Sequence, residues 1–336
     1  MARIGVIMVS MLLCLAGCVT LPADSSMQKN DDQRDSLQEK KKSEDQNETS
    51  IKKNSEKEKK PPKTLFEWAI LGQQDEKEKK DENENGDEEN KRLDPDRPHL
   101  PEAASTVGLG RVILESGYTY TSKGPAFFHQ HSYPEALLRV GLFADWFEFR
   151  VSQNFINQKD IPGSGQPASI VGAQDLEIGV KLALTEQKSY LPEAALILQT
   201  SVPTGIANLT NDTVMPGVNL DLGWEIAKDR FGVETVTSAN GARDELGHPF
   251  VNFVQGVTGV FNVTRKLEAF GEYDLFVPIG ALGGEQAREE THQQEYLVGG
   301  FVYFINNNFE VDIRAGVGLN KHASDYLLGT GFAARY

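Results

Sequence analysis

The sequence contains almost no cysteine. Its 336 residues include only two, Cys14 and Cys18, and both lie in the N-terminal apolar segment. A mature chain that has lost or modified this segment has no pair of thiols for a disulfide and no thiol for a metal centre. We therefore expect a protein whose folding does not depend on oxidation.

Basic residues are also in the minority. The chain has 34 Lys and Arg against 49 Asp and Glu, a formal net charge of -15 and an isoelectric point of about 4.9. This balance argues against nucleic acid as a partner, because phosphate binding needs a basic face. The N-terminal apolar run, residues 4–13, is too short to span a bilayer comfortably as a helix.

The sequence signatures of common enzymes are missing. There is no Gly-x-Ser-x-Gly motif, and no glycine-rich phosphate loop opens a helix. Nearly all histidines fall in predicted loops or near strand ends, and His129 with His131 would give a metal only two ligands. We expect no catalytic residue, no cofactor and no metal site. An enzyme is the least favoured function.

The N-terminus resembles an export signal. Arg3 precedes the short apolar run, which ends in Leu15-Ala16-Gly17-Cys18. This tetrapeptide resembles the lipobox of bacterial lipoproteins. The resemblance implies a signal peptide at 1–17 and a diacylglycerol on the Cys18 thiol, and Val19 in place of Asp implies sorting to the outer membrane. The alternative is an ordinary signal peptide with an incidental cysteine.

A long charged segment follows the signal. Residues 18–92 are dominated by Lys, Glu, Asp, Asn, Gln and Ser. Apolar residues are too few to offset the entropy of ordering, which predicts a disordered periplasmic tether. An apolar island interrupts it at 64–73, where Leu65, Trp68 and Leu71 have helical spacing. We expect a short helix that docks loosely or lies on the membrane surface; a partner-binding motif is the alternative.

From about residue 109 the chain alternates between apolar and polar positions, which predicts strands with two different faces. Between 309 and 319 the odd positions are apolar, and the even positions are charged residues or glycine. About twelve such strands of roughly 11 to 15 residues are long enough to cross a bilayer. We place them near 109–121, 133–144, 146–157, 171–184, 191–202, 216–227, 229–239, 249–263, 266–279, 291–305, 308–320 and 324–336.

The links between these strands alternate in length. Short turns alternate with long loops, which are expected at 122–132, 158–170, 203–215, 240–248 and 280–290. Alternation over an even strand count is typical of outer-membrane barrels, whose short turns lie in the periplasm. The sequence therefore predicts an all-β fold, an antiparallel transmembrane β-barrel of about twelve strands in outer-membrane lipid, preceded by the disordered linker.

The last strand ends on an aromatic residue. Phe332 and Tyr336 would face lipid. This ending resembles the assembly signal that the barrel-assembly machinery of Gram-negative bacteria recognises. The resemblance implies that machinery as a partner, and an outer-membrane location with the N-terminal tether in the periplasm.

Two stretches resemble a particular outer-membrane family. Residues 93–121 carry Asp-Arg-Pro at 96–98, then Glu102, then Glu-x-Gly-x-x-Tyr from 115 to 120, and residues 312–336 form the last hairpin. Both resemble the transporter-like family named for the meta-pathway of phenol degradation. The resemblance covers residues 93–336 and implies a barrel that passes small, often aromatic or apolar, compounds.

The segment before the first strand, 93–108, is expected to act as a plug. Pro98 removes a backbone donor and stiffens the chain, so the segment is poorly suited to extend the sheet. The plug candidates are Asp96, Arg97 and Glu102. Glu115 and Arg111 are the expected partners of the charged pair Asp96 and Arg97.

If the apolar faces meet lipid, the charged faces line the lumen. Mixed acids and bases there allow two interpretations: pairs that fill a narrow barrel, or an acidic pathway that disfavours anions. The lumen-facing candidates are Arg111, Glu115, Arg139, Glu148, Arg150, Glu177, Lys181, Glu225, Glu268, Glu272, Asp274, Glu310, Asp312 and Arg314.

The sequence thus predicts a passive outer-membrane transporter or channel for small neutral or hydrophobic compounds, aromatic ones included. Phe270 and Phe276 are apolar candidates on the lumen face of one strand. The alternative is a structural or adhesive lipid-anchored barrel whose lumen is closed by charge pairs. The sequence leaves open which solute would pass, and in which direction.

Overall fold

The computed structural model describes residues 62–71, 92–124, 128–160, 168–207, 209–243, 247–280 and 292–336. The chain divides into two compact units, Met1–Lys60 and Pro61–Tyr336, and all described residues belong to the second. The predicted signal peptide and Cys18 lie outside the described residues, as does most of the predicted tether.

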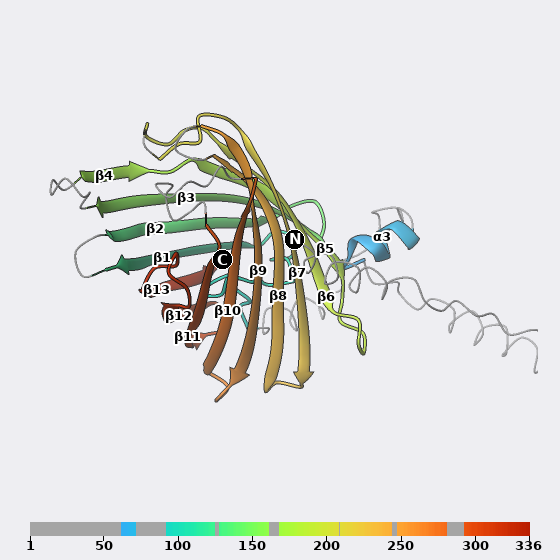
Figure 1. Cartoon of the computed structure of the whole chain (residues 1–336). Helices are drawn as coiled ribbons and strands as arrows, with labels where there is room; N and C mark the ends of the chain where they lie inside the picture. The colour runs from blue at the N-terminus through green and yellow to red at the C-terminus, as the bar shows by residue number, and fades with distance from the viewer. Residues whose placement is uncertain are drawn as a thin grey trace, which may run out of the picture. The chain divides into compact units, whose positions relative to one another are not determined.

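Among the described residues, thirteen strands form one antiparallel sheet that closes on itself (Figure 1). Successive strands pair with each other, except that β5 pairs with β3 instead of β4, and β1 closes the ring by pairing with β13. The strands are β1 (Val112–Lys123), β2 (Phe128–Gly141), β3 (Phe147–Asp160), β4 (Ala168–Ala173), β5 (Leu176–Thr185), β6 (Glu193–Val202), β7 (Met215–Ala227), β8 (Phe231–Arg243), β9 (Pro249–Asn262), β10 (Leu267–Ile279), β11 (Gln294–Asn306), β12 (Phe309–Gly318) and β13 (Tyr326–Arg335).

The predicted twelve-stranded antiparallel barrel is confirmed, with one division. The predicted strand at 171–184 is split into β4 and β5 at Gln174-Asp175. As a result, residues 155–160 of β3 pair with β4, and residues 147–152 of β3 pair with β5. The Asp175 carboxylate accepts the backbone N–H groups of Gly205 (3.0 Å) and Asn211 (2.8 Å). These bonds tie the break to the loop that follows β6.

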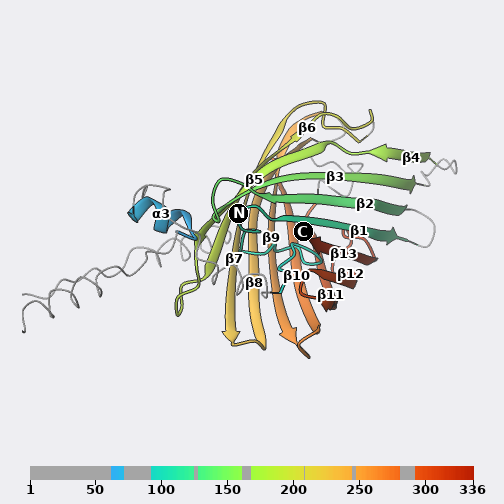
Figure 2. The same cartoon turned by 180° about the vertical axis from the view of Figure 1, so that it is seen from behind.

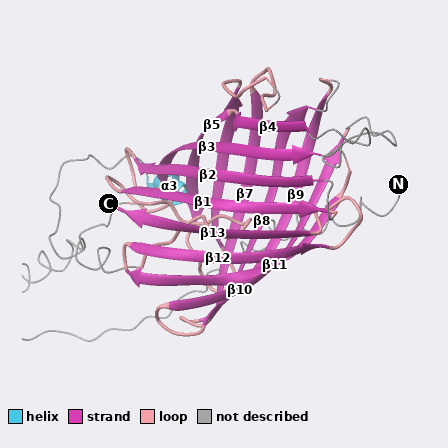
Figure 3. Cartoon of the chain, turned by 90° about the vertical axis from the view of Figure 1, so that its left-hand side faces the viewer, coloured by secondary structure: helices cyan, strands magenta, loops and turns pink. Residues whose placement is uncertain are grey.

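The faces of the sheet are inverted relative to a water-soluble protein. In β12, Ile313 is 58% exposed while Glu310 and Asp312 are at most 1% exposed. Apolar side chains therefore cover the outside of the wall and charged ones fill the inside, as in a barrel surrounded by lipid. The strands of the near and far walls cross steeply in Figure 3, which reflects the tilt that closes a sheet of this size.

The strand ends define two rims. One rim, here called the turn end, carries the short links 142–146, 186–192, 228–230, 263–266 and 307–308. Tyr336 lies at the same rim, because its backbone N–H and C=O both bond Val112. The opposite rim, the loop end, carries the links at 203–214 and 319–325 among the described residues.

One predicted loop is wrong. The long loop at 122–132 is mostly strand, since β1 runs to Lys123 and β2 begins at Phe128. The polar residues of this stretch bond across the strands: the Tyr118 hydroxyl lies 2.8 Å from His131 Nδ1, and the Tyr120 hydroxyl lies 2.8 Å from His129 Nδ1. His129 and His131 are therefore strand residues and not loop residues.

A short helix, α3 (Leu65–Leu71), lies within the predicted apolar island. The Thr64 hydroxyl caps it by accepting the Glu67 N–H at 3.2 Å. It contacts β5, and the Trp68 ring lies 5.6 Å from the ring of Trp146, in the link before β3. In the part of the chain that is described, no helix is long and apolar enough to cross a membrane.

Candidate functional site

Residues 93–108, here called the inner segment, lie inside the barrel. Their side chains and backbone bond to β1, β2, β3, β5, β7, β8, β10, β12 and β13, on all sides of the ring. Both ends of the segment lie at the turn end, where Leu93 donates its N–H to Asn307 (2.8 Å) and Val107 donates to Glu148 (3.0 Å). The segment thus enters and leaves by one rim; it is the blue-green trace before β1 in Figure 2.

Asp96 is the centre of a buried ion network. Its carboxylate lies 2.6 Å from Arg150, 2.7 Å from Lys181 and 3.0 Å from Arg139. Burial alone would raise the pKa of Asp96, but the three cations outweigh it and hold this pKa well below its usual range. Asp96 is therefore a carboxylate under all physiological conditions, and it binds the inner segment to three strands at once.

A second set of acids completes the network around Arg139. The Arg139 guanidinium lies 2.8 Å from Glu148 and 3.1 Å from Glu115, and all three side chains are fully buried. Glu115 also accepts the backbone N–H groups of Asp96 (3.0 Å) and Arg97 (2.9 Å). Each buried charge has an opposite charge beside it, which is the condition under which burial of ions is tolerated.

Glu102 completes the network on the far side of Asp96. Its carboxylate lies 2.6 Å from Arg150 and 3.6 Å from Lys181. Burial raises the pKa of Glu102 to about 7, against the attraction of Arg150, and the nearby Asp96 charge acts in the same direction as burial. The backbone N–H of Glu102 donates to Asp221 on β7 at 3.1 Å.

Arg97 binds the wall at two strands. Its guanidinium lies 2.9 Å from Glu135 on β2 and 3.3 Å from Asp312 on β12. It passes between two glycines of the wall: a β-carbon at Gly117 would lie 2.3 Å from the guanidinium, and one at Gly331 would lie 2.4 Å from its Nε. Only glycine at these positions leaves room for the arginine.

The tip of the inner segment, 98–101, points away from the turn end. The Pro98 carbonyl accepts from Arg314 (2.7 Å), and the Leu100 N–H donates to Glu272 (2.8 Å). His99 Nδ1 lies 3.2 Å from Glu234, and its ring meets the edge of Phe270. The tip is thus bonded to β8, β10 and β12.

The remaining predicted residues occupy different places. Glu268 is buried and pairs with Arg92 at 2.9 Å. Glu310 is also buried, and neither of its carboxylate oxygens has a hydrogen-bond partner among the residues that the structure describes. Glu225 is exposed at the turn end, where it accepts the Asp229 N–H, and so does not lie in the buried interior. Arg111 precedes β1 and is half-buried.

Phe332 and Tyr336, the residues of the expected assembly signal, lie toward the turn end. Phe332 packs near Phe309 of β12, with ring centroids 6.1 Å apart. The Tyr336 side chain is 79% exposed, while its backbone closes the ring with Val112.

Sequence reasoning missed two functional contacts. Arg92 was assigned to the tether but bonds Glu268 and lies over the Phe304 ring at 4.0 Å. The expected partner Glu115 accepts the backbone N–H groups of Asp96 and Arg97, but the sequence does not predict that the Asp96 carboxylate meets Arg139, Arg150 and Lys181. The alternation of the strands predicts that Arg139, Arg150 and Lys181 all face the lumen, but alternation does not predict how far along the barrel axis each residue lies.

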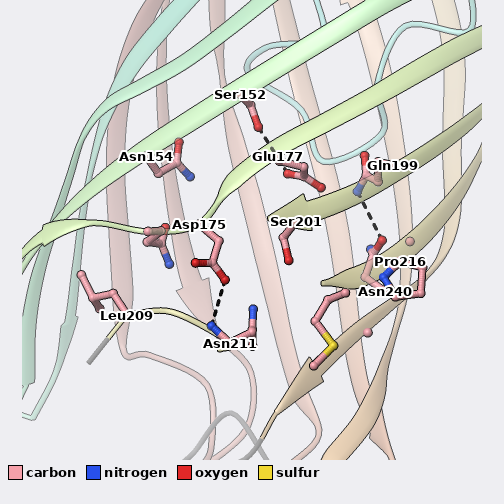
Figure 4. Close-up of a pocket in the computed structure, with 14 residues that line it drawn as sticks. Ser152, Asn154, Asp175, Glu177, Gln199, Ser201, Leu209, Asn211, Pro216 and Asn240 are labelled. Atoms are coloured by element: carbon pink, nitrogen blue, oxygen red, sulfur yellow. Dashed lines mark hydrogen bonds between the residues drawn. The ribbon is translucent and has the colours of Figure 1, made fainter. Parts of the chain in front are cut away.

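Two adjoining cavities occupy the interior on the loop-end side of the network. The larger, of about 450 Å³, lies against the inner segment, and the smaller, of about 220 Å³, lies beside the β4–β5 break. Both are lined by Ser152, Asn154, Glu177 and Gln199, which makes them neighbours. Figure 4 shows the smaller cavity, whose labelled side chains are mostly amides and hydroxyls.

The arrangement suits passage or binding of a small molecule better than chemistry. No group of three or more His, Cys, Asp and Glu side chains is placed to hold a metal ion within the ranges that the structure describes. The polar cavity walls, the ion network and the surrounding closed sheet are the features that a function must use.

Known barrels share this architecture. The crystal structure of the COG4313 outer membrane channel from Pseudomonas putida F1 is 12% identical, with a TM-score of 0.55 over 69% of this chain and 98% of that one. The NanC porin is 9% identical (TM-score 0.41; 66% and 98% covered), and the CymD monoaromatic hydrocarbon channel is 10% identical (TM-score 0.35; 68% and 88% covered). The first of these likenesses shows the fold.

No curated protein sequence matches the chain. Residues 95–336, which include the inner segment from Pro95 onward and every strand, match the family described as putative MetA-pathway of phenol degradation. The chain belongs to this family.

Proposed function

We propose that this protein is a passive outer-membrane channel for small neutral or hydrophobic solutes, aromatic ones included. The observation that carries the proposal is the pair of adjoining cavities inside a closed barrel whose outer face is apolar. A solute that enters at the loop end meets the smaller cavity and then the larger one. The names of the COG4313 channel and the CymD monoaromatic hydrocarbon channel agree with transport, and CymD with an aromatic solute.

The inner segment would be the plug of this channel. Its network with Arg139, Arg150 and Lys181 fills the turn-end half of the lumen. Since outer-membrane barrels place short turns in the periplasm, we infer that the turn end and the inner segment face the periplasm. The lipid on Cys18 and the charged tether would lie on the same side.

Deletion of the plug tests this function. Removal of residues 94–104 should raise single-channel conductance in planar bilayers, because it empties the turn-end half of the lumen. Removal of residues 20–60, which belong to the predicted tether, is the control and should leave conductance unchanged. Heat-modifiable migration on gels checks that each variant keeps a folded barrel.

A point substitution gives the same test without shortening the chain. Gly331→Val places a branched side chain where Arg97 now lies, while Gly271→Val adds it where nothing lies within 4 Å. We expect only Gly331→Val to raise conductance. If neither the intact nor the altered barrels conduct, and none takes up aromatic solutes into proteoliposomes, the alternative of a structural, charge-closed barrel is correct.

A further inference from the structure

The larger cavity has two chemically different walls. One wall is apolar and consists of Phe276, Tyr296, Val298 and Leu327, which pack into a cluster with Phe270. The other walls carry charged and polar side chains from the inner segment and from β2, β3, β5, β6, β10 and β12. A solute with an apolar body and a polar head would match this division better than a solute of one character.

The bases that line the cavity are already engaged. Arg150 pairs with Asp96 and Glu102, and Arg97 pairs with Glu135 and Asp312. Arg314 donates to the Pro98 carbonyl at 2.7 Å and to the Thr119 hydroxyl at 2.9 Å. The inner segment therefore uses the positive charge of the lumen to hold itself in place.

Three of the acids that line the same cavity have no ion-pair partner within 4 Å among the described residues. Glu177 accepts only from the Ser152 hydroxyl, and Glu272 accepts from the Leu100 N–H and from Thr258. Asp274 is 5% exposed, and its Oδ1 has no hydrogen-bond partner. The charged groups beside Asp274 are Glu272, Arg314 and His99.

Asp274 lies two residues before Phe276 on β10, on the same face of the strand, so its carboxylate stands at the edge of the apolar wall, beside Glu272. A carboxylate accepts hydrogen bonds and attracts positive charge, and it gains most where water is excluded. An ammonium group placed there would satisfy the acceptor while its apolar body rests on Phe276 and Tyr296.

We propose that the larger cavity is a binding site for small organic cations, specifically amines with an aromatic or aliphatic body, with Asp274 as the residue that receives the ammonium group. This inference rests on the proposed function and extends its solutes from neutral and hydrophobic compounds to cations with an apolar body. Anions of the same size are disfavoured by Glu177, Glu272 and Asp274 together.

Equilibrium binding to the full chain in detergent micelles tests the site directly. The probes are 2-phenylethylammonium, the neutral 2-phenylethanol and the anion phenylacetate, which share one aromatic body. Both probes can donate a hydrogen bond to the carboxylate, but only the ammonium group adds the attraction of a full positive charge, so the cation should bind at least roughly tenfold more tightly than the alcohol by titration calorimetry. Equal affinities for the cation and the alcohol would overturn the proposal.

Asp274→Asn keeps the shape of the side chain and removes its charge. It should weaken binding of the cation by roughly tenfold and leave binding of the alcohol unchanged. The matched control is Glu310→Gln, which removes a buried, unpartnered carboxylate that does not line the cavity, and it should change neither affinity. An Asp274→Asn variant that binds the cation as the wild type does would contradict the assignment.

Two further measurements keep the outcomes separate. If Asp274→Asn does not fold, the salt dependence of the wild type decides: affinity for the cation should fall as salt rises, while affinity for the alcohol should not. Uptake of the alcohol into proteoliposomes tests the channel independently of the site. Binding without uptake would leave the site standing and reject the channel; uptake without preference for the cation would do the reverse.

Discussion

At the scale of single residues, Asp96 decides how the interior is organised. It lies in a segment outside the sheet, yet it meets Arg139, Arg150 and Lys181 from three strands within 3.0 Å. Loss of one partner from such a network leaves an uncompensated buried charge, which costs about 3–5 kcal/mol. The network therefore holds the inner segment in one place. It also pairs Arg139, Arg150 and Lys181 with acids of the network, so that these bases are not available to pair with Asp274.

Glu102 gives this network a pH dependence. Its pKa is raised by burial from 4.5 to about 7 in the folded chain, so the folded state holds a proton that the unfolded chain releases between these values. Stability from this group is therefore present at low pH and is lost as the pH rises through about 7. We predict that the wild type unfolds at a lower temperature at pH 8 than at pH 5.5.

Glu102→Gln should flatten that difference, because glutamine has no proton to lose. The measurement is the temperature at which the heat-modifiable band disappears at each pH. Asp94→Asn, a substitution of an exposed acid in the same segment, is the control and should keep the wild-type difference. A pH difference that survives Glu102→Gln would show that another group is responsible.

At the scale of elements, alternation in each strand decides which side chains meet lipid and which fill the lumen. β12 shows it best, because Ile313 is exposed on the outside while its neighbour Arg314 bonds the Pro98 carbonyl inside. A shift of one residue would exchange the faces of a whole strand. The same alternation places Gly117 and Gly331 on the inner face, where Arg97 needs the space.

The phase of β12 can be tested with a pair of adjacent substitutions. Ile313→Arg should impair assembly into the membrane, since a basic side chain on the lipid face costs about 2–4 kcal/mol at the bilayer midplane. Arg314→Ile should do less harm, because it removes two hydrogen bonds in the lumen and adds no charge to lipid. The yield of heat-modifiable barrel measures both. A worse defect from Arg314→Ile would mean that the strand phase is shifted by one residue.

At the scale of the whole molecule, the barrel and the tether have opposite compositions. The wall buries charged residues inside a closed sheet, many of them in ion pairs, whereas residues 18–60 have too few apolar side chains to build a core. The contacts with the barrel begin earlier in the chain than composition indicates. Arg92 already bonds Glu268, and α3 contacts β5, so residues from 62 onward include parts that meet the barrel.

The tether is predicted to be dispensable for folding of the barrel. Deletion of residues 20–60 should leave the heat-modifiable band and its unfolding temperature unchanged, because the described contacts with the barrel come from α3 and from residues 92 onward. Deletion of residues 62–92 is the comparison and should lower the unfolding temperature, since it removes Arg92 and Trp68. A loss of folded barrel in the shorter deletion would contradict the prediction.

The sequence by itself determined the barrel: its strand count, the inward or outward face of each strand, and the short turns. These follow from alternation and chain length, which are local properties of the chain. The loop predicted at 122–132 is wrong, because the sequence alone does not show that Tyr118 and Tyr120 contact His131 and His129 across the strands.

Only the tertiary structure decided which charges meet. The sequence places Asp96, Arg139, Arg150 and Lys181 in segments up to 85 residues apart, and the hydrogen bond between Asp96 and Lys181 spans that whole separation. Their meeting depends on strand tilt, on register and on the path of the inner segment. The larger cavity depends on the same factors. Its apolar wall, its paired bases and Asp274 come together only once the barrel has closed.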